Sequence, residues 1–149
     1  MGTTDQLCHL LMQTTYDTLP APVIAVAKRI ILDGLAVAVA GSIEDGPRIA
    51  AEHVKSLGGT PVSTVLGAGF KTSPVSAALV NGIAMHVLDY EPMWSPPTHA
   101  TSPTLPAILA LAEMENASGQ DIITAFVKGC EIQGRIRLAR RPGERRRHL

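Results

Sequence analysis

The sequence predicts an all-α fold with one short extended segment, and three observations lead to this prediction. Apolar residues recur at helical spacing in several segments of the 149-residue chain. The composition is 46% hydrophobic but only 3% aromatic, and aliphatic side chains of this kind suit closely packed helices. Proline, glycine and small polar residues separate the apolar segments, as expected where helices start and stop. The length allows one ordinary domain with a sizeable core.

Each expected helix has a boundary signal. Thr3 or Thr4 can cap the first helix, and Gly41 can end the second. Ser73 and Pro74 are a typical cap and first helical residue. The helix that follows them is apolar nearly all round, so we expect it to be buried. The helices are expected over residues 4–18, 23–39, 47–57, 75–88, 103–117 and from residue 120 onward.

Residues 60–66 differ from the rest because they are short, β-branched and bounded by Pro61 and Gly67. They are typical of an extended segment. A single strand cannot form a sheet, so we expect this one to pair outside the chain or to lie along the surface. Residues 67–71 are expected to be a loop.

The charge is unevenly distributed. Residues 1–134 hold 6 Lys/Arg and 12 Asp/Glu, a net charge of −6, whereas residues 135–149 hold 7 Arg and 1 Glu, a net charge of +6. The domain is therefore expected over residues 1–139, and residues 140–149 are expected to be a disordered Arg-rich tail. Three interpretations of the tail are a solvated extension, an arm for anionic partners, and an out-of-frame sequence. The abrupt change in composition favours the third.

Two features predict a cytoplasmic protein. Cys8 and Cys130 match no metal spacing and are expected to be free thiols. No apolar run reaches the roughly 18 residues that a membrane span needs, and the N-terminus lacks the pattern of a secretory signal.

Candidate chemistry gathers in a proline-rich loop between two apolar helices, within residues 81–113. Prolines restrict the backbone, so such a loop can hold its side chains in a fixed geometry. Asp89 and Glu91 supply carboxylates, Thr98 a hydroxyl, and His99 a group that titrates near neutral pH. Together they could transfer protons or bind a carboxylate substrate.

Structural alternatives apply to the same residues. Asp89 could cap the preceding helix, and Trp94 could be a packing anchor. His86, on the apolar helix, is interpreted as a core histidine. A metal site built from His86, Asp89, Glu91 and His99 matches no standard spacing, so no metal is predicted.

A series of short motifs occurs in order over residues 20–135. The motifs are Asp33-Gly34-Leu35 with Ala40-Gly41, Ala77-Ala78-Leu79-Val80-Asn81-Gly82, His86-Val87-Leu88-Asp89-Tyr90-Glu91, Pro97-Thr98-His99, Leu105-Pro106-Ala107, Ala110-Leu111-Ala112-Glu113, Ser118-Gly119, and Gly129-Cys130-Glu131 with Arg135. This series resembles the MmgE/PrpD family, which includes 2-methylcitrate dehydratase and cis-aconitate decarboxylase.

The resemblance implies part of a large helical domain, the N-terminal part of a lyase that acts on small di- or tricarboxylates without metal or organic cofactor. Asp89 and His99 fall on the family's active-site positions and are predicted to be catalytic. Glu91, Thr98 and Trp94 are predicted to bind substrate. The full-length form is expected to be a homodimer, with no nucleic-acid or membrane partner.

Two departures from the family qualify this prediction. Pro92 and Met93 stand where the family has an acidic residue and then Thr or a similar polar residue, which disfavours itaconate-type decarboxylation. Full members also continue well beyond residue 149, with further catalytic residues and a lid domain. We therefore expect a truncated and inactive lyase, with a non-catalytic helical module that associates with a full-length relative as the alternative.

Overall fold

The computed structural model describes residues 2–94 and 98–139 and confirms the mostly helical fold. The tail predicted over residues 140–149 lies outside the described residues. The elements in chain order are α1 (Thr3–Gln13), the 3-10 helix η1 (Tyr16–Thr18), α2 (Ala21–Gly41), α3 (Asp45–Leu57), β1 (Ser63–Val65), β2 (Phe70–Thr72), α4 (Pro74–His86), α5 (Thr101–Glu115) and α6 (Gly119–Leu138).

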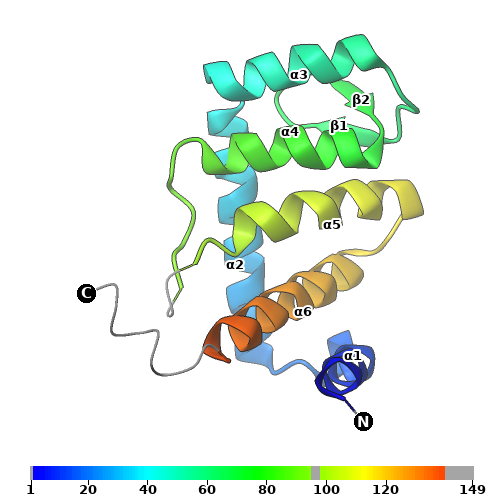
Figure 1. The fold of residues 1–149 in the computed structure, drawn as a ribbon, viewed down its shortest axis with the longest axis vertical. Helices are drawn as coiled ribbons and strands as arrows, with labels where there is room; N and C mark the ends of the chain where they lie inside the picture. Colours follow the sequence, from blue (N-terminus) through cyan, green and yellow to red (C-terminus); the bar gives the residue numbers. More distant parts are fainter. Residues whose placement is uncertain (1, 95–97, 140–149) are drawn as a thin grey trace.

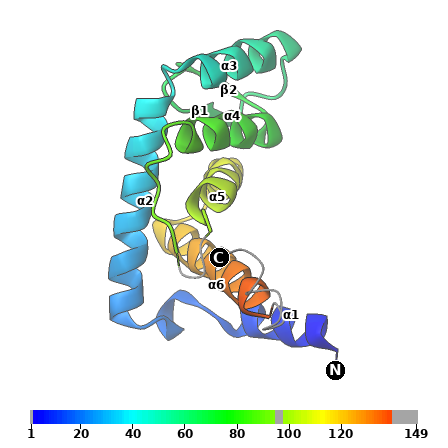
Figure 2. The same cartoon turned by 60° about the vertical axis from the view of Figure 1, so that its left-hand side comes forward.

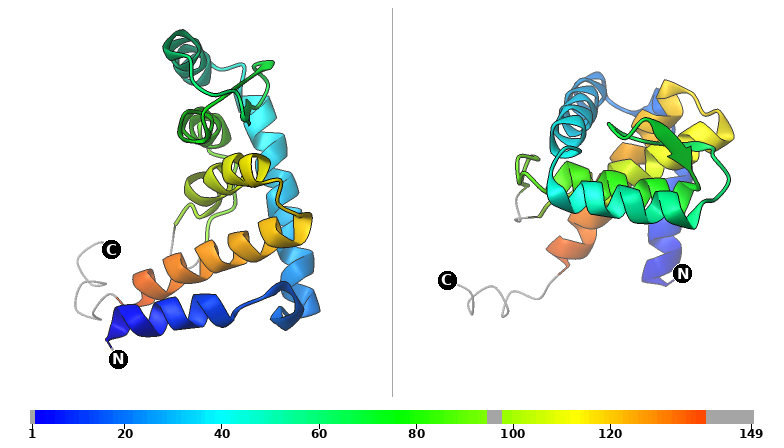
Figure 3. Two further views of the ribbon diagram at one scale, coloured as in Figure 1. Left: turned by 90° about the vertical axis from the view of Figure 1, so that its right-hand side faces the viewer. Right: turned by 90° about the horizontal axis from the view of Figure 1, so that it is seen from above.

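The long helix α2 organises the domain. Figure 1 shows it running along the length of the molecule, and Figure 3 shows α3, α4, α5, α6 and α1 stacked beside it one after another. In Figure 1 and Figure 2 the connection leaves the end of α4 and descends past α5 toward α6. The candidate loop therefore joins two neighbouring helices of this stack.

Two glycines let α2 approach its neighbours closely. A Cβ atom at Gly34 would lie 2.9 Å from Cγ2 of Thr101 and 3.0 Å from Cδ2 of Leu105. A Cβ atom at Gly41 would lie 2.1 Å from the carbonyl oxygen of Ala84. Positions seven residues apart share one helix face. This face of α2 is thus fitted to α4 and α5, the two helices that flank the candidate loop.

Small and aliphatic side chains fill the interior in two clusters. The larger contains Ala27, Ala38, Met85, Ala100, Leu105, Ile123, Phe126 and Cys130. The smaller contains Val54, Val65, Ala77, Val80 and Ala110. Ala100 immediately follows His99, so the end of the candidate loop is anchored in the larger cluster.

Several helix boundaries differ from the prediction by one or two residues, and the differences at the first helix and at α5 have a clear cause. The first helix ends at Gln13, and η1 is separate from it, because Thr14 and Thr15 adopt extended backbone. Helix α5 begins at Thr101, before both Pro103 and Pro106. Pro103 is tolerated because the first four backbone N–H groups of a helix have no intrahelical partner, whereas Pro106 lies inside the helix and removes one of its hydrogen bonds.

The prediction that residues 60–66 form an unpaired segment is wrong. β1 pairs antiparallel with β2, which the sequence assigned mainly to a loop. β1 is also buried rather than lying along the surface, since Ser63 is 0% and Val65 1% exposed. Tertiary contacts hold this short hairpin, because the Glu113 carboxylate of α5 accepts hydrogen bonds from both Thr64 and Lys71.

Asn81 of α4 fastens the end of β1 from the other side. Its Oδ1 accepts the Leu66 N–H at 2.8 Å, and its Nδ2 donates to the Thr64 carbonyl at 2.9 Å. Asn81 is itself only 2% exposed. One buried amide thus satisfies two backbone groups of the hairpin.

Replacing Asn81 by alanine is expected to lower the free energy of unfolding by about 1–3 kcal/mol, because it leaves a backbone donor and acceptor without partners. Denaturant unfolding followed by circular dichroism measures this change. Thr124→Ala is the control, since it removes only an exposed hydrogen bond to the Gln120 carbonyl and should cost less than about 0.5 kcal/mol. Equal small losses for both variants would contradict the assignment.

The predicted burial of the α4 helix on all sides is wrong for one face. Ala77, Val80, Ala84 and Met85 are buried, but Val75 is 82% and Leu79 57% exposed. α4 packs on α2, α3, α5 and the hairpin, and these neighbours leave one apolar strip uncovered. Within residues 2–94 and 98–139, no helix combines the length and hydropathy needed to cross a membrane.

Candidate active site

The candidate site lies where α4 ends and the loop to α5 begins. His86 is the last residue of α4, and its carbonyl accepts the Asp89 N–H at 2.9 Å. Asp89 has a φ of 54°, a left-handed conformation that Asp tolerates better than most residues. This tight turn reverses the chain. Asp89 thus closes the helix end with its backbone, while its side chain stays 77% exposed.

Glu91 lies at the centre of the site and is fully buried, with a side-chain exposure of 0%. Its Oε2 accepts the backbone N–H of Ser102 at 2.7 Å, and its Oε1 accepts the Ser102 hydroxyl. Oε1 also lies 2.8 Å from Nδ1 of His86. The carboxylate therefore joins the end of α4 to the first turn of α5.

These contacts determine the charge of Glu91. Burial alone raises its pKa, but the hydrogen bonds from Ser102 and His86 and the charge of His99 outweigh burial, so the net pKa is lowered. Glu91 is consequently a carboxylate at neutral pH, and its oxygens only accept hydrogen bonds.

His99 lies between the two carboxylates of the loop. Its Nε2 is 3.6 Å from Oδ1 of Asp89, and its Nδ1 is 3.4 Å from Oε1 of Glu91. Its ring meets the His86 ring edge to face, with centroids 4.7 Å apart. The His99 side chain remains 29% exposed. A partly exposed imidazole between two acids is suited to proton transfer and to binding an anion.

The arm of the loop beyond Glu91 is held by backbone pairing. Met93 and His99 form an antiparallel bridge, and the Trp94 N–H donates to the Thr98 carbonyl at 3.2 Å. Met93, the bridge partner of His99, is 62% exposed. The residues predicted for the site thus lie on one loop, with His99 next to both Asp89 and Glu91.

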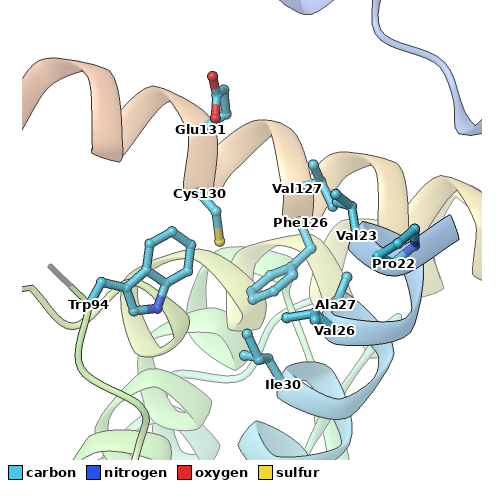
Figure 4. Close-up of a pocket in the computed structure, with 10 residues that line it drawn as sticks. All are labelled: Pro22, Val23, Val26, Ala27, Ile30, Trp94, Phe126, Val127, Cys130 and Glu131. Carbon is cyan, nitrogen blue, oxygen red and sulfur yellow. The ribbon is translucent and has the colours of Figure 1, made fainter. Parts of the chain in front are cut away.

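Trp94 lines an apolar cavity that includes none of the candidate acids and histidines of the loop. Figure 4 shows its indole in an apolar cavity of about 350 Å³ together with Phe126, Cys130 and side chains of α2. Burial raises the pKa of the Cys130 thiol to about 12, so it stays protonated. Both cysteines are free, as predicted. Trp94 makes the contacts of a packing anchor, and a direct substrate contact stays a prediction.

The interpretation of His86 as a core histidine is wrong, because its side chain is 51% exposed. Apolar neighbours suggested burial, but the last residue of a helix can turn its side chain toward the loop and solvent. His86 and Ser102 also border a groove of about 520 Å³ between α4 and α5.

Ser102 is the site residue that the sequence did not reveal. It was expected near the helix start, and it lies in the first turn of α5, where backbone N–H groups need an acceptor from outside the helix. The available signal was the acidic Glu91 in the preceding loop, which could have been expected to accept hydrogen bonds from the start of the next helix.

His86, Glu91 and His99 each offer one potential metal ligand, and these atoms lie within 4.8 Å of one another. A bound zinc ion would need them about 2.0–2.2 Å from the metal, on lone pairs that carry no proton. In this structure the Glu91 oxygens are instead surrounded by hydrogen-bond donors. The prediction of no metal site therefore stays a prediction.

Fold and site together define a helical domain that holds a histidine and two carboxylates on one loop. The MmgE/PrpD N-terminal domain matches residues 5–149, a range that extends on both sides of the motif series found in the sequence. The chain belongs to the MmgE/PrpD family.

Its relatives include three cis-aconitate decarboxylases. The human protein is 38% identical over 76% of this chain, the mouse protein 36% over 74%, and the Aspergillus terreus protein 31% over 91%. These matches cover 25%, 24% and 29% of the respective relatives. The chain thus spans about a quarter of the length of the curated relatives it matches.

Proposed function

We propose that this domain is the N-terminal part of a carboxylate lyase that eliminates water or carbon dioxide from a small di- or tricarboxylic acid. The observation that carries the proposal is the placement of His99 between Asp89 and Glu91. Membership of the MmgE/PrpD family and the similarity to cis-aconitate decarboxylases support the substrate class.

Asp89 and His99 are the proposed catalytic residues. When protonated, His99 can attract a substrate carboxylate and donate a proton through Nε2. When His99 is neutral and carries its proton on Nδ1, the lone pair of Nε2 can accept a proton. The exposed Asp89 can orient this nitrogen or exchange a proton with it. No metal or organic cofactor is needed for these steps.

Substrate binding is proposed for Thr98 and Trp94 on the same loop. The exposed Met93 has no polar group to offer a carboxylate, so the substrate contact made by a polar residue at this place in the family is lost. We therefore favour dehydration over decarboxylation of the itaconate-forming kind.

The test uses a protein of the relatives' length that carries residues 1–139 of this chain as its N-terminal domain, called here the family-length protein. It is incubated with a panel of di- and tricarboxylates, and the products are identified by proton NMR. Turnover of at least one acid is expected, with water loss on a hydroxy acid as the leading result. A folded family-length protein that converts none of the acids would overturn the proposal.

For residues 1–149 alone we expect no turnover, because they span about a quarter of the length of the curated relatives. The alternative function, a non-catalytic module that associates with a full-length relative, is favoured by the uncovered apolar residues of α4. Size-exclusion chromatography of the chain mixed with the family-length protein distinguishes the two functions, because only an associating module would co-elute with that protein. The cytoplasmic location and the homodimer of the full-length form remain predictions.

A further inference from the structure

The buried Glu91 carboxylate is fixed more firmly than a substrate-binding group needs to be. Both of its oxygens receive hydrogen bonds from Ser102, one from the backbone and one from the hydroxyl. The side chain is 0% exposed, so a substrate cannot reach it without opening the loop. Its position suits a residue that acts on its neighbours.

Glu91 determines which nitrogens of the two histidines carry protons. A buried carboxylate has no proton to donate and no water around it, so a nitrogen that faces it closely is favoured in the protonated form. The Asp89 carboxylate near Nε2 is 77% exposed, so water competes for its oxygens and its hold on a proton is weaker. Nδ1 of His86 lies 2.8 Å and Nδ1 of His99 3.4 Å from the same oxygen, Oε1. Of these two nitrogens, that of His99 is buried and has no hydrogen-bond partner among the described residues. Glu91 is therefore the nearest acceptor for its proton.

We propose that Glu91 is a positioning residue whose carboxylate holds neutral His99 with its proton on Nδ1, so that Nε2 is the atom that exchanges protons. Nε2 points to the side of the loop where the exposed Asp89 lies, 3.6 Å away. His86 shares the same oxygen and its ring packs against His99, which limits rotation of the His99 ring. A hydrogen-bond acceptor at one ring nitrogen in this way fixes the tautomer and the orientation of a histidine.

This assignment replaces a direct substrate contact by Glu91. Its importance for catalysis rests on the proposed function, but the tautomer itself does not. A free neutral histidine side chain prefers the proton on Nε2, where it would block the exposed nitrogen from accepting a proton. Without Glu91, a fraction of the molecules would therefore carry the proton on Nε2 of His99 and lack the lone pair that general-base catalysis requires there.

Nitrogen-15 NMR of the histidine-labelled 149-residue chain tests the tautomer, at a pH where the histidines are neutral. The His99 signals are assigned by comparison with His99→Gln. In the unsubstituted chain we expect Nδ1 to carry the proton. In Glu91→Gln we expect a mixture, or a proton mainly on Nε2. Glu113→Gln is the control, since this exposed carboxylate bonds Thr64 and Lys71 and its loss should leave the His99 signals unchanged.

A proton on Nε2 of His99 in the unsubstituted chain would overturn the proposal, and this result needs no variant to fold. An unchanged Nδ1 tautomer in folded Glu91→Gln would overturn it as well. In the family-length protein, Glu91→Gln should lower kcat at least about tenfold and leave KM within about threefold, because the substrate does not touch the group. Absence of activity in the unsubstituted protein would count against the proposed function alone.

Discussion

In the family-length protein, His99→Ala is expected to lower kcat/KM at least about a hundredfold, and Asp89→Asn is expected to do the same. A positioned acid or base typically contributes about 10²–10⁴-fold to rate, and a hundredfold loss corresponds to about 2.7 kcal/mol of transition-state stabilisation. His99 supplies the exposed nitrogen, and Asp89 supplies the carboxylate that faces it at 3.6 Å. Steady-state kinetics on the acid with the highest turnover measures both effects.

His53→Ala is the matched control for this experiment. His53 is exposed on α3, away from the candidate loop, so its replacement should leave kcat/KM unchanged within about twofold. Thermal melting of each variant separates loss of chemistry from loss of fold. Near-normal turnover in His99→Ala, at an unchanged melting temperature, would show that the site has been assigned to the wrong histidine.

Gly41→Ala is expected to produce the largest loss of stability. The new Cβ would lie 2.1 Å from the Ala84 carbonyl oxygen and 2.8 Å from Cγ1 of Val87. Because the first of these atoms belongs to the backbone, no side-chain rotation relieves the clash, and α2 must move away from α4. Overpacking costs about 1–3 kcal/mol, and we expect the upper end of this range. That corresponds to a fall of roughly 10 °C in Tm.

Gly134→Ala is the same substitution at a place where the structure predicts a gain in stability instead of a loss. Gly134 lies inside α6, and a Cβ atom there meets no other atom within 4 Å. Alanine should therefore stabilise the helix by about 0.5–1 kcal/mol, since glycine loses more backbone entropy on folding. Calorimetry of both variants is decisive, and a Gly41→Ala protein as stable as the unsubstituted chain would refute the close contact.

Most of the fold could be predicted because its signals are local. Apolar spacing and the boundary residues Ser73, Pro74 and Gly41 are read within one or two helical turns. The β1–β2 hairpin could not be predicted in the same way. Each strand has three residues, and the hairpin is held by Asn81 and Glu113, which are distant in sequence.

The candidate site was predictable to the extent that it lies on one loop. Asp89, Glu91 and His99 fall within eleven residues, and the structure brings them into contact. The roles of His86 and Ser102 depend on how α4 and α5 meet, which no local pattern encodes. A histidine among apolar residues suggested the core, whereas its place at the helix end turns it toward Glu91.

The Glu91 contacts also determine which parts of the domain can open together. One carboxylate bonds the end of α4 through His86 and the start of α5 through Ser102, so an opening that displaces Glu91 releases both helix ends at once. Amide hydrogen exchange in these turns should accordingly follow a single opening reaction. His99 cannot keep its orientation in a state where Glu91 has left its place, because the event that frees the helix ends also frees the imidazole.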